Sequence, residues 1–468
     1  MSKSRYLALP VCLWLAACTD PVGFQDFGFS APALWSRLTG ENGKPASADA
    51  PLAMDAQAKI DHQWWTHFSD PVLDQLITLA LTNNQSLAIA KARVEEARAN
   101  RGLARSALLP QINGLGSASR ANQGYLTNNQ TYTVAEADLS ASWEVDLFGR
   151  NQAKTAQAQA LLESQEDNQN AVRVSLLAEV ARNYFDYRND ERQIDLTRKN
   201  LDTEQKTLDL VEAQRQGALA SDFDVSRAAA QVATTQAQIP ALESARDAAL
   251  NRINILLGVP PGTRDALLAQ PQDLKPLDQH IVIAAPASVL ATRPDVAAAE
   301  RQFAASISAK EAATRQVFPD ISLTALFGAQ YASPFNSNPW SLGASLTQPI
   351  LNFGRIQSQI DAADSQQTQA FLTYQQTVLT ALEDMENALS YYIHESTRNA
   401  NLTTATQQSS KAAELARQSY ANGESSLLDL LVSERDLLAA QSAQAASDAA
   451  LRVDLATVYS AAGGGWKD

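Results

Sequence analysis

The sequence contains two uninterrupted stretches that are too long for the helices of an ordinary globular domain. Arg150–Gln216 comprises 67 consecutive residues without glycine or proline, and residues 355–422 comprise 68. At a rise of ~1.5 Å per residue, a helix over the first stretch would be roughly 100 Å long. Each stretch follows a similar tetrapeptide, Leu147–Arg150 or Asn352–Arg355, at an offset of 205 residues. The chain is therefore predicted to be internally duplicated and rod-like.

The charge of the chain and its scattered histidines exclude some classes of function. There are 37 Lys and Arg against 51 Asp and Glu, a formal net charge of −14. Nucleic-acid-binding proteins present basic surfaces, so we expect no nucleic-acid partner; the acidity serves either solubility or an acidic duct. His62, His67, His280 and His394 lack metal-ligand spacing. With no catalytic constellation, we predict neither an enzyme nor a metal or other cofactor.

The N-terminus has the pattern of a bacterial lipoprotein signal. Lys3 and Arg5 precede an apolar run of about 12 residues, too short for a transmembrane anchor, and Leu15–Cys18 resembles a lipobox. We therefore predict that residues 1–17 form a signal peptide, that Cys18 carries lipid such as palmitate, and that 18–60 form a lipidated arm. A plain cleavage site is the alternative. Among lipoproteins, a threonine at position 19 rather than an aspartate implies delivery to the outer membrane.

Residues 135–147 alternate strictly, with every odd position apolar and every even position polar. This period predicts a β-strand with one apolar and one polar face, and its length fits a transmembrane barrel strand. A strand of a soluble sandwich is the alternative. Strands are predicted at about 111–120, 134–147, 320–331 and 340–350. The predicted barrel-lumen residues are the carboxylates of the polar face, namely Glu136, Asp138, Glu144 and Asp146.

The predicted fold class is α plus transmembrane β, with repeats at 61–270 and 271–468. Four strands cannot close a barrel in lipid, because open edges leave backbone groups unsatisfied. Three copies supply twelve strands, an even number, whereas the eight strands of a dimer would enclose no channel. The long helices carry only a partial heptad seam, which grows polar with distance from the strands and suits a water-filled tunnel. A simple coiled-coil tether is the alternative.

The chain resembles the outer-membrane efflux proteins of the TolC type, in the lipoprotein branch that serves resistance-nodulation-division pumps. The resemblance covers nearly the whole mature chain. It rests on the order of several landmarks: Trp65–Ile77, Asn84–Leu87, Phe148–Arg150, Arg293–Asp295, Phe353–Arg355 and Tyr420–Asp429.

This resemblance implies a homotrimer whose twelve-stranded barrel in outer-membrane lipid continues into a periplasmic helical tunnel. The implied function is the exit duct of a tripartite multidrug efflux pump, which conducts small toxic compounds passively outward. A periplasmic adaptor and an inner-membrane transporter are the implied partners, and no cofactor is bound. A type I secretion exit duct and a non-efflux tether or porin are the alternatives.

The resemblance also implies a gate at the tunnel tip, which the family closes with aspartates, a tyrosine and an arginine. Tyr420 and Asp429 match the tyrosine and one aspartate. Ser425 stands at the usual arginine position and Val432 at that of a possible second aspartate, so the closing network departs from the familiar pattern.

The corresponding turn of the first repeat offers Asp222 and Asp224 as further aperture residues. As an alternative, Asp222 and Ser426 are simply helix N-caps. Asp429 lies three residues inside its helix, so we expect it to be a weaker capping residue and favour it for the aperture.

Overall fold

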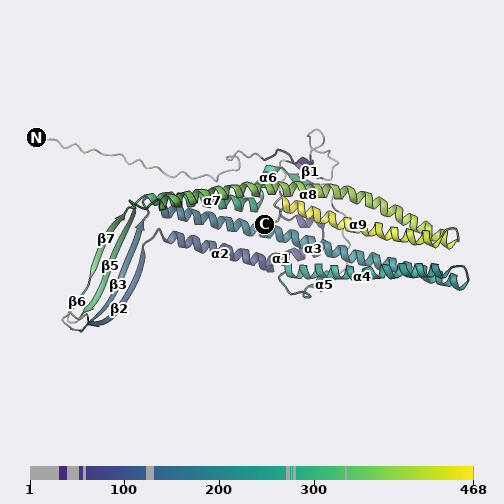
Figure 1. The fold of residues 1–468 in the computed structure, drawn as a ribbon, viewed down its shortest axis with the longest axis horizontal. Coiled ribbons are helices and arrows are strands. Elements are labelled where there is room, and N and C mark those ends of the chain that lie inside the picture. Colours follow the sequence, from purple (N-terminus) through teal and green to yellow (C-terminus); the bar gives the residue numbers. More distant parts are fainter. Residues whose placement is uncertain are drawn as a thin grey trace.

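The protein is a long rod of helices with a β-sheet at one end and two helix turns at the other (Figure 1). The computed structural model describes residues 31–38, 52–55, 60–122, 131–269, 275, 277, 281–332 and 335–466. The predicted signal peptide and Cys18 lie outside these residues. Among the described residues, no helix combines the length and apolar character needed to cross a membrane.

The first repeat begins with two helices where the sequence pattern predicts one from Pro71 to about Leu108. Helix α1 (Pro71–Asn83) starts as expected, because the Asp70 carboxylate accepts the backbone N–H groups of its first turn. The helix then ends and α2 (Gln85–Ser106) begins, with Asn84 between them in extended conformation. The expectation of one continuous helix is wrong, because the Asn84 side chain caps a second start.

Four helices form the shaft of the rod. Helices α3 (Arg150–Gln216) and α8 (Arg355–Ala421) have 67 residues each, and α4 (Asp222–Leu256) and α9 (Leu427–Ala461) have 35 each. Each long helix turns back into the shorter one of its repeat, and α3 also packs on α9. The predicted duplication and the predicted long helices are confirmed.

Shorter helices complete the half of the shaft next to the sheet. There α2 packs on α3, and α7 (Pro294–Thr314) packs on both α3 and α8. A short helix, α6 (Pro286–Thr292), precedes α7. The remaining small helices are η2 (Ser36–Leu38), η3 (Trp64–Phe68), α5 (Asp265–Leu268) and η5 (Arg315–Val317).

The sheet at the end of the rod is antiparallel, in the order β2-β3-β5-β7. Its long strands are β2 (Gln111–Asn122), β3 (Thr131–Val145), β5 (Asp320–Ala332) and β7 (Trp340–Thr347), and the short β6 (Phe335–Ser337) also pairs with β5. The register sets Ile112 opposite Ala141, Ala141 opposite Ala325, and Ala325 opposite Leu342. One face is therefore apolar across all four strands.

The main hydrophobic core lies midway along the rod, where the C-terminal end of the chain also lies (Figure 1). Trp64 stacks on Tyr459, and Phe68 packs on Phe185 with ring centroids 4.8 Å apart. The Tyr184 hydroxyl donates to the Asp70 carboxylate at 2.5 Å. Helix starts, aromatic rings and the end of α9 are thus fixed together in one place.

An N-terminal segment is held against this core. Strand β1 (Leu52–Asp55) pairs in parallel with β4 (Ile281–Ala284), so this segment joins the connection between the repeats. The Trp35 indole is fully buried and donates to the Ala284 carbonyl at 2.8 Å. The Glu386 carboxylate on α8 accepts two backbone N–H groups and one hydroxyl from Ser36 and Arg37.

Candidate functional site: helix tips, strand junctions and a buried arginine

The two helix turns at the far end of the rod follow one plan. Helix α4 is N-capped by Ser221 and α9 by Ser426, each serine accepting the backbone N–H of an aspartate three residues later at 3.2 Å. Asp224 and Asp429 reciprocate by accepting the backbone N–H of these serines. Both helices thus start with a capping box.

These contacts correct part of the sequence interpretation. The expectation that Asp429 is a weak capping residue is wrong, because its carboxylate reaches back to the Ser426 N–H and hydroxyl. Ser426 is an N-cap, as the alternative interpretation held. Asp222 is not the cap; it is the first residue of α4 and pairs with Arg215 at 2.8 Å.

Tyr420 connects the two helix hairpins near their tips. Its hydroxyl donates to Gln214 Oε1 on α3 at 2.7 Å. The ring packs against a small apolar cluster of Val211, Leu427 and Leu431. Burial, and then the nearby Asp224 carboxylate, raise the pKa of Tyr420, so the hydroxyl keeps its proton and remains a donor.

Ser425 and Val432 show what replaces the familiar charged network at this tip. Within the described part of the chain, the Ser425 hydroxyl has no hydrogen-bond partner. Val432 is half-buried on α9. Neither side chain supplies a charge. Among the described residues, Tyr420 is the predicted aperture residue whose hydrogen bond links the two hairpins.

A buried acidic pair lies further up the shaft, and the sequence analysis missed it. Glu204 on α3 and Glu434 on α9 are each 1% exposed. Glu434 Oε1 accepts from Arg417 Nε at 3.0 Å, and Glu204 Oε1 accepts from Gln231 Nε2 at 3.0 Å. Their Oε2 atoms have no hydrogen-bond partner among the described residues.

The pKa of Glu434 is raised, chiefly by burial; Arg417 lowers it, and the charge of Glu204 raises it further. Each glutamate is therefore hydrogen-bonded within its own hairpin, and between the hairpins the two like charges interact unfavourably. In the sequence, polar residues beside the partial heptad seam were the only signal, and they equally fit a wet tunnel wall.

The predicted lumen residues on β3 share the less exposed face of that strand. Glu136 and Asp138 are half-buried, whereas Ala137 and Leu139 on the apolar face are exposed. Gln330 Nε2 on β5 donates to Glu136 Oε1 at 2.5 Å. Asp138 lies opposite Gly328, where an added Cβ would meet its carboxylate oxygen at 1.9 Å.

The other two predicted lumen carboxylates hold the junction between β3 and α3. Glu144 accepts from Arg150 Nη2 at 2.6 Å and from Asn151 Nδ2 at 3.1 Å. Asp146 follows the last residue of β3 and accepts the backbone N–H groups of Asn151 and Gln152. A negative side chain at a helix N-terminus is favourable, so the alternating pattern also encodes the start of the long helix.

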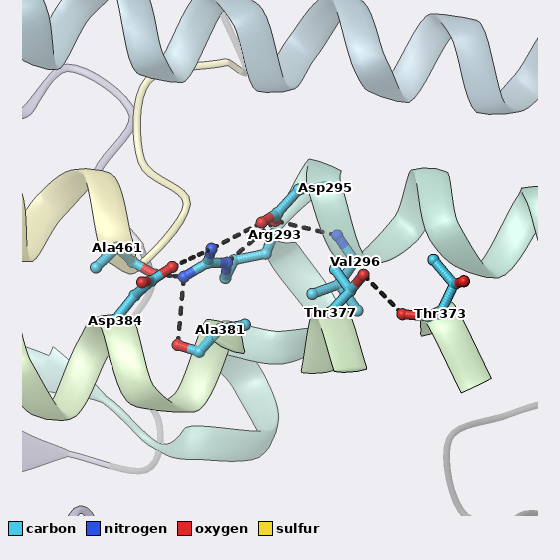
Figure 2. A network of polar contacts seen from close by, with 8 residues as sticks. All are labelled: Arg293, Asp295, Val296, Thr373, Thr377, Ala381, Asp384 and Ala461. Carbon is cyan, nitrogen blue, oxygen red and sulfur yellow. Dashed lines mark hydrogen bonds and ion pairs between the residues drawn. The ribbon is translucent and has the colours of Figure 1, made fainter. Parts of the chain in front are cut away.

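Arg293 binds three helices together at the start of the second repeat (Figure 2). Its side chain is 9% exposed and forms ion pairs with Asp295 at 2.7 Å and with Asp384 of α8 at 3.0 Å. Its Nη1 atom donates to the carbonyl oxygens of Ala381 and Ala461. The motif that served as a family landmark therefore fixes α7, α8 and the end of α9 relative to one another.

The described residues contain no group of three or more His, Cys, Asp or Glu side chains arranged to hold a metal ion. Their assembled features are instead a sheet with an exposed apolar face, a long helical shaft and a capped pair of helix tips. These features define a membrane duct.

Comparison with known proteins agrees with this class. The family model for outer membrane efflux proteins matches residues 76–259 and 285–464. The pyoverdine export outer membrane protein OpmQ of Pseudomonas aeruginosa is 32% identical, over 100% of this chain and 98% of its own length. The toluene efflux pump outer membrane protein TtgI of Pseudomonas putida is 30% identical over 99% of each chain. The solved outer-membrane channel OprN has a TM-score of 0.84 and 30% identity, covering 93% of this chain and 97% of its own.

The chain belongs to the outer membrane efflux protein family, which confirms the predicted family and fold class. It is an outer-membrane exit duct of an efflux pump and projects into the periplasm. The family is one of channels, not of enzymes.

Proposed function

We propose that three copies close a twelve-stranded barrel in the outer membrane, with their helices continuing as one tunnel. The observation that carries this proposal is the sheet, because β2 and β7 each have one edge that no other described strand pairs with. In lipid, open strand edges leave backbone groups without partners. Large apolar side chains also stand exposed on one face of the sheet: Ile112, Leu139, Phe327, Trp340, Leu342 and Leu346. Such a sheet fits lipid outside and water inside.

The cargo we propose is small toxic compounds, delivered by a periplasmic adaptor and an inner-membrane transporter of the resistance-nodulation-division class. The printed names of two relatives support this, since one is a pyoverdine export protein and another belongs to a toluene efflux pump. A deletion strain profiled against solvents, dyes, drugs and metals tests it. Unchanged sensitivity to every compound, together with loss of a secreted protein, would favour the type I secretion alternative.

We further propose that Cys18 carries the lipid and holds the arm at the outer membrane. The support is the lipobox pattern and the bacterial envelope location of the family. Cys18→Ser removes the acylation site but leaves the barrel as the main attachment, so much trimer should still reach the membrane. Mass spectrometry of the mature N-terminus decides the point, and an N-terminus without acyl mass contradicts it.

The lumen carboxylates Glu136, Asp138, Glu144 and Asp146 should give the open duct a preference for cations. Reversal potentials in planar bilayers under a salt gradient measure this. Glu136→Gln with Asp138→Asn is the informative pair, because Glu144 and Asp146 also hold the start of α3. Anion selectivity in the unaltered protein contradicts this assignment.

For the gate, Tyr420, Asp429, Asp222 and Asp224 should meet their counterparts around the trimer axis. Tyr420→Phe with Asp429→Asn should raise single-channel conductance, and asparagine keeps an acceptor for the capping box. Ser426→Ala is the matched control, because it weakens the cap without removing charge. Equal conductance of the double variant and the unaltered protein would place the constriction elsewhere.

A further inference from the structure

The two strand-to-helix junctions share a left-handed glycine, but only the second has a left-handed residue before it, Phe353 with a φ of 49°, and their surroundings are opposite. Gly149 and Gly354 precede the two 67-residue helices with φ of 76° and 85°. At the first junction, Phe148 stacks on Phe318 with ring centroids 4.8 Å apart. Arg315 donates to the Phe148 carbonyl. Both partners come from the second repeat, so this junction is completed within the chain.

The second junction has no such cover. Phe353 occupies the position of Phe148, yet its side chain is 90% exposed, and the neighbouring Ile350 and Leu351 are also exposed. The position that corresponds to Phe318 in the first repeat is Leu109, because each directly precedes the proline before a strand. Leu109 is 63% exposed. Both halves of an apolar contact are therefore present in the chain, but they do not meet there.

The internal strand pairing supplies a template for how two copies meet. Gly149 and Gly354 are 205 residues apart, and Pro110 and Pro319 are 209 apart. Ala141 of β3 pairs with Ala325 of β5. The residue that corresponds to Ala141 in the second repeat is Leu346 on β7, and the residue that corresponds to Ala325 in the first repeat is Gly116 on β2. Leu346 is therefore expected to lie opposite Gly116. Both residues lie on the apolar faces of their strands, so the apolar face continues from β7 to β2.

We propose that β7 pairs with β2 of a second copy in this register, and that Phe353 packs on Leu109 of the partner subunit. The inference rests on the proposed ring closure and assigns its contact residues. Its chemistry differs from that of the internal junction. There Arg150 pairs with Asp320 at 2.9 Å and with Glu144 at 2.6 Å.

The corresponding positions at the junction between copies are uncharged. Gln111 stands where Asp320 stands in the other repeat, and Pro349 stands where Glu144 stands. Arg355 therefore has no carboxylate at either place. The contact between copies depends on apolar burial, whereas the contact within the chain also uses an ion pair.

Cysteine cross-linking tests the register directly. Opposed residues in antiparallel strands have Cα atoms about 4.5 or 5.5 Å apart, within disulfide range. A side chain at Gly116 meets no atom outside its chain neighbours closer than 4.0 Å. Leu346→Cys with Gly116→Cys should therefore give covalent trimers under oxidant on a non-reducing gel. The natural cysteines, Cys12 and Cys18, lie far away in the sequence, and each single variant controls for them.

The shifted pairs Leu346→Cys with Ser117→Cys and Leu346→Cys with Ala118→Cys are the matched controls. Both should cross-link several-fold less. Stronger cross-linking in a shifted pair, while trimers persist, overturns the register but leaves the proposed barrel intact. A covalent ladder that continues beyond three copies, or a mass below three copies in detergent, overturns the proposed barrel itself.

Phe353 gives an independent measurement. Phe353→Ala should make heated trimers dissociate about tenfold faster or more, because it removes most of a buried aromatic contact. Phe353→Leu keeps apolar volume and should stay near the unaltered rate. Monomer helix content, measured by circular dichroism, should be unchanged in both. Equal dissociation rates for the alanine variant and the unaltered protein overturn the contact with Leu109 of the partner subunit.

Discussion

The two repeats fasten the end of their last helix in the same way but with different chemistry. In the first repeat, the Asn84 amide donates to the Leu256 carbonyl at the end of α4, at 2.8 Å. In the second, the Arg293 guanidinium donates to the Ala461 carbonyl at the end of α9, at 3.1 Å. Each acceptor is the last residue of its helix, and each donor lies directly before α2 or α7.

The difference lies in what each donor requires. An asparagine amide has two donors and can be satisfied by a few contacts, whereas arginine has five donors and a permanent charge. Arg293 accordingly pairs with Asp295 and Asp384. In the first repeat, the residue 205 positions before Asp384 is Glu179, and it pairs with Arg252 of α4 instead. The same backbone arrangement thus allows the last carbonyl of the helix to accept a hydrogen bond from either a neutral or a charged side chain.

Replacing Arg293 should have the largest effect of these comparisons. Arg293→Ala leaves the carbonyls of Ala381 and Ala461 without their donor and removes two ion pairs to partly exposed carboxylates, so we expect a loss of about 2–3 kcal/mol. Arg293→Lys keeps the charge but lacks the forked geometry, so it should recover only part of the loss. Thermal unfolding followed by circular dichroism measures both, and a loss no greater than that of Asn84→Ala would contradict the role of the charge.

Asn84→Ala should cost less, about 1–2 kcal/mol, because it removes one buried hydrogen bond and one helix cap. The side chain both donates to Leu256 and accepts the Leu87 N–H at 3.0 Å. Asn84→Asp separates the two parts, since aspartate keeps the cap but cannot donate to Leu256. If Asn84→Ala and Asn84→Asp lower the stability equally, the capping contact to the Leu87 N–H contributes nothing measurable.

The sequence predicted the duplication, the long helices and the strand alternation because these depend on local period. It did not predict the break at Asn84, where a side chain capable of capping interrupts an otherwise helical pattern. It also misjudged Asp429: Ser426 was considered as an N-cap, but the reciprocal contact from the third residue of the helix back to the Ser426 N–H was not. The Glu204–Glu434 pair depends on which faces of α3 and α9 meet, and local period does not determine that.

Glu434→Gln should change how the stability of the shaft depends on pH. Because burial raises the pKa of Glu434 above its ordinary value of 4.5, the folded state holds a proton that the unfolded state releases first. The contribution of protonated Glu434 to the stability of the folded state is full below about pH 4.5 and is lost as pH rises through its raised pKa. Glutamine does not titrate, so Glu434→Gln should not lose this stability as pH rises.

The comparison must be made against the unaltered protein, because other buried acids titrate in the same range. Burial is the main cause that raises the pKa of Asp167, Asp190 and Asp454 to about 6 in each case, with smaller effects from nearby charges. Glu414→Gln is the matched control, since Glu414 lies 3.7 Å from the same Arg417 but is exposed. Thermal midpoints at about pH 4.5 and about pH 7.5 should differ less in Glu434→Gln than in either other protein.

The smallest effect is expected at the left-handed residue of each helix tip, which is an alanine in one tip and a glycine in the other. Ala218 has a φ of 61°, while Gly423, 205 residues later, has a φ of 74°. A left-handed conformation costs a residue with a Cβ roughly 1–2 kcal/mol, and glycine returns about 0.5–1 kcal/mol as extra entropy of the unfolded chain. Ala218→Gly should therefore stabilise its tip by about 0.5 kcal/mol, and Gly423→Ala should destabilise the other tip by a similar amount. Hydrogen exchange at the two turns resolves such local differences; slower exchange in Gly423→Ala would show that the tips do not share one backbone plan.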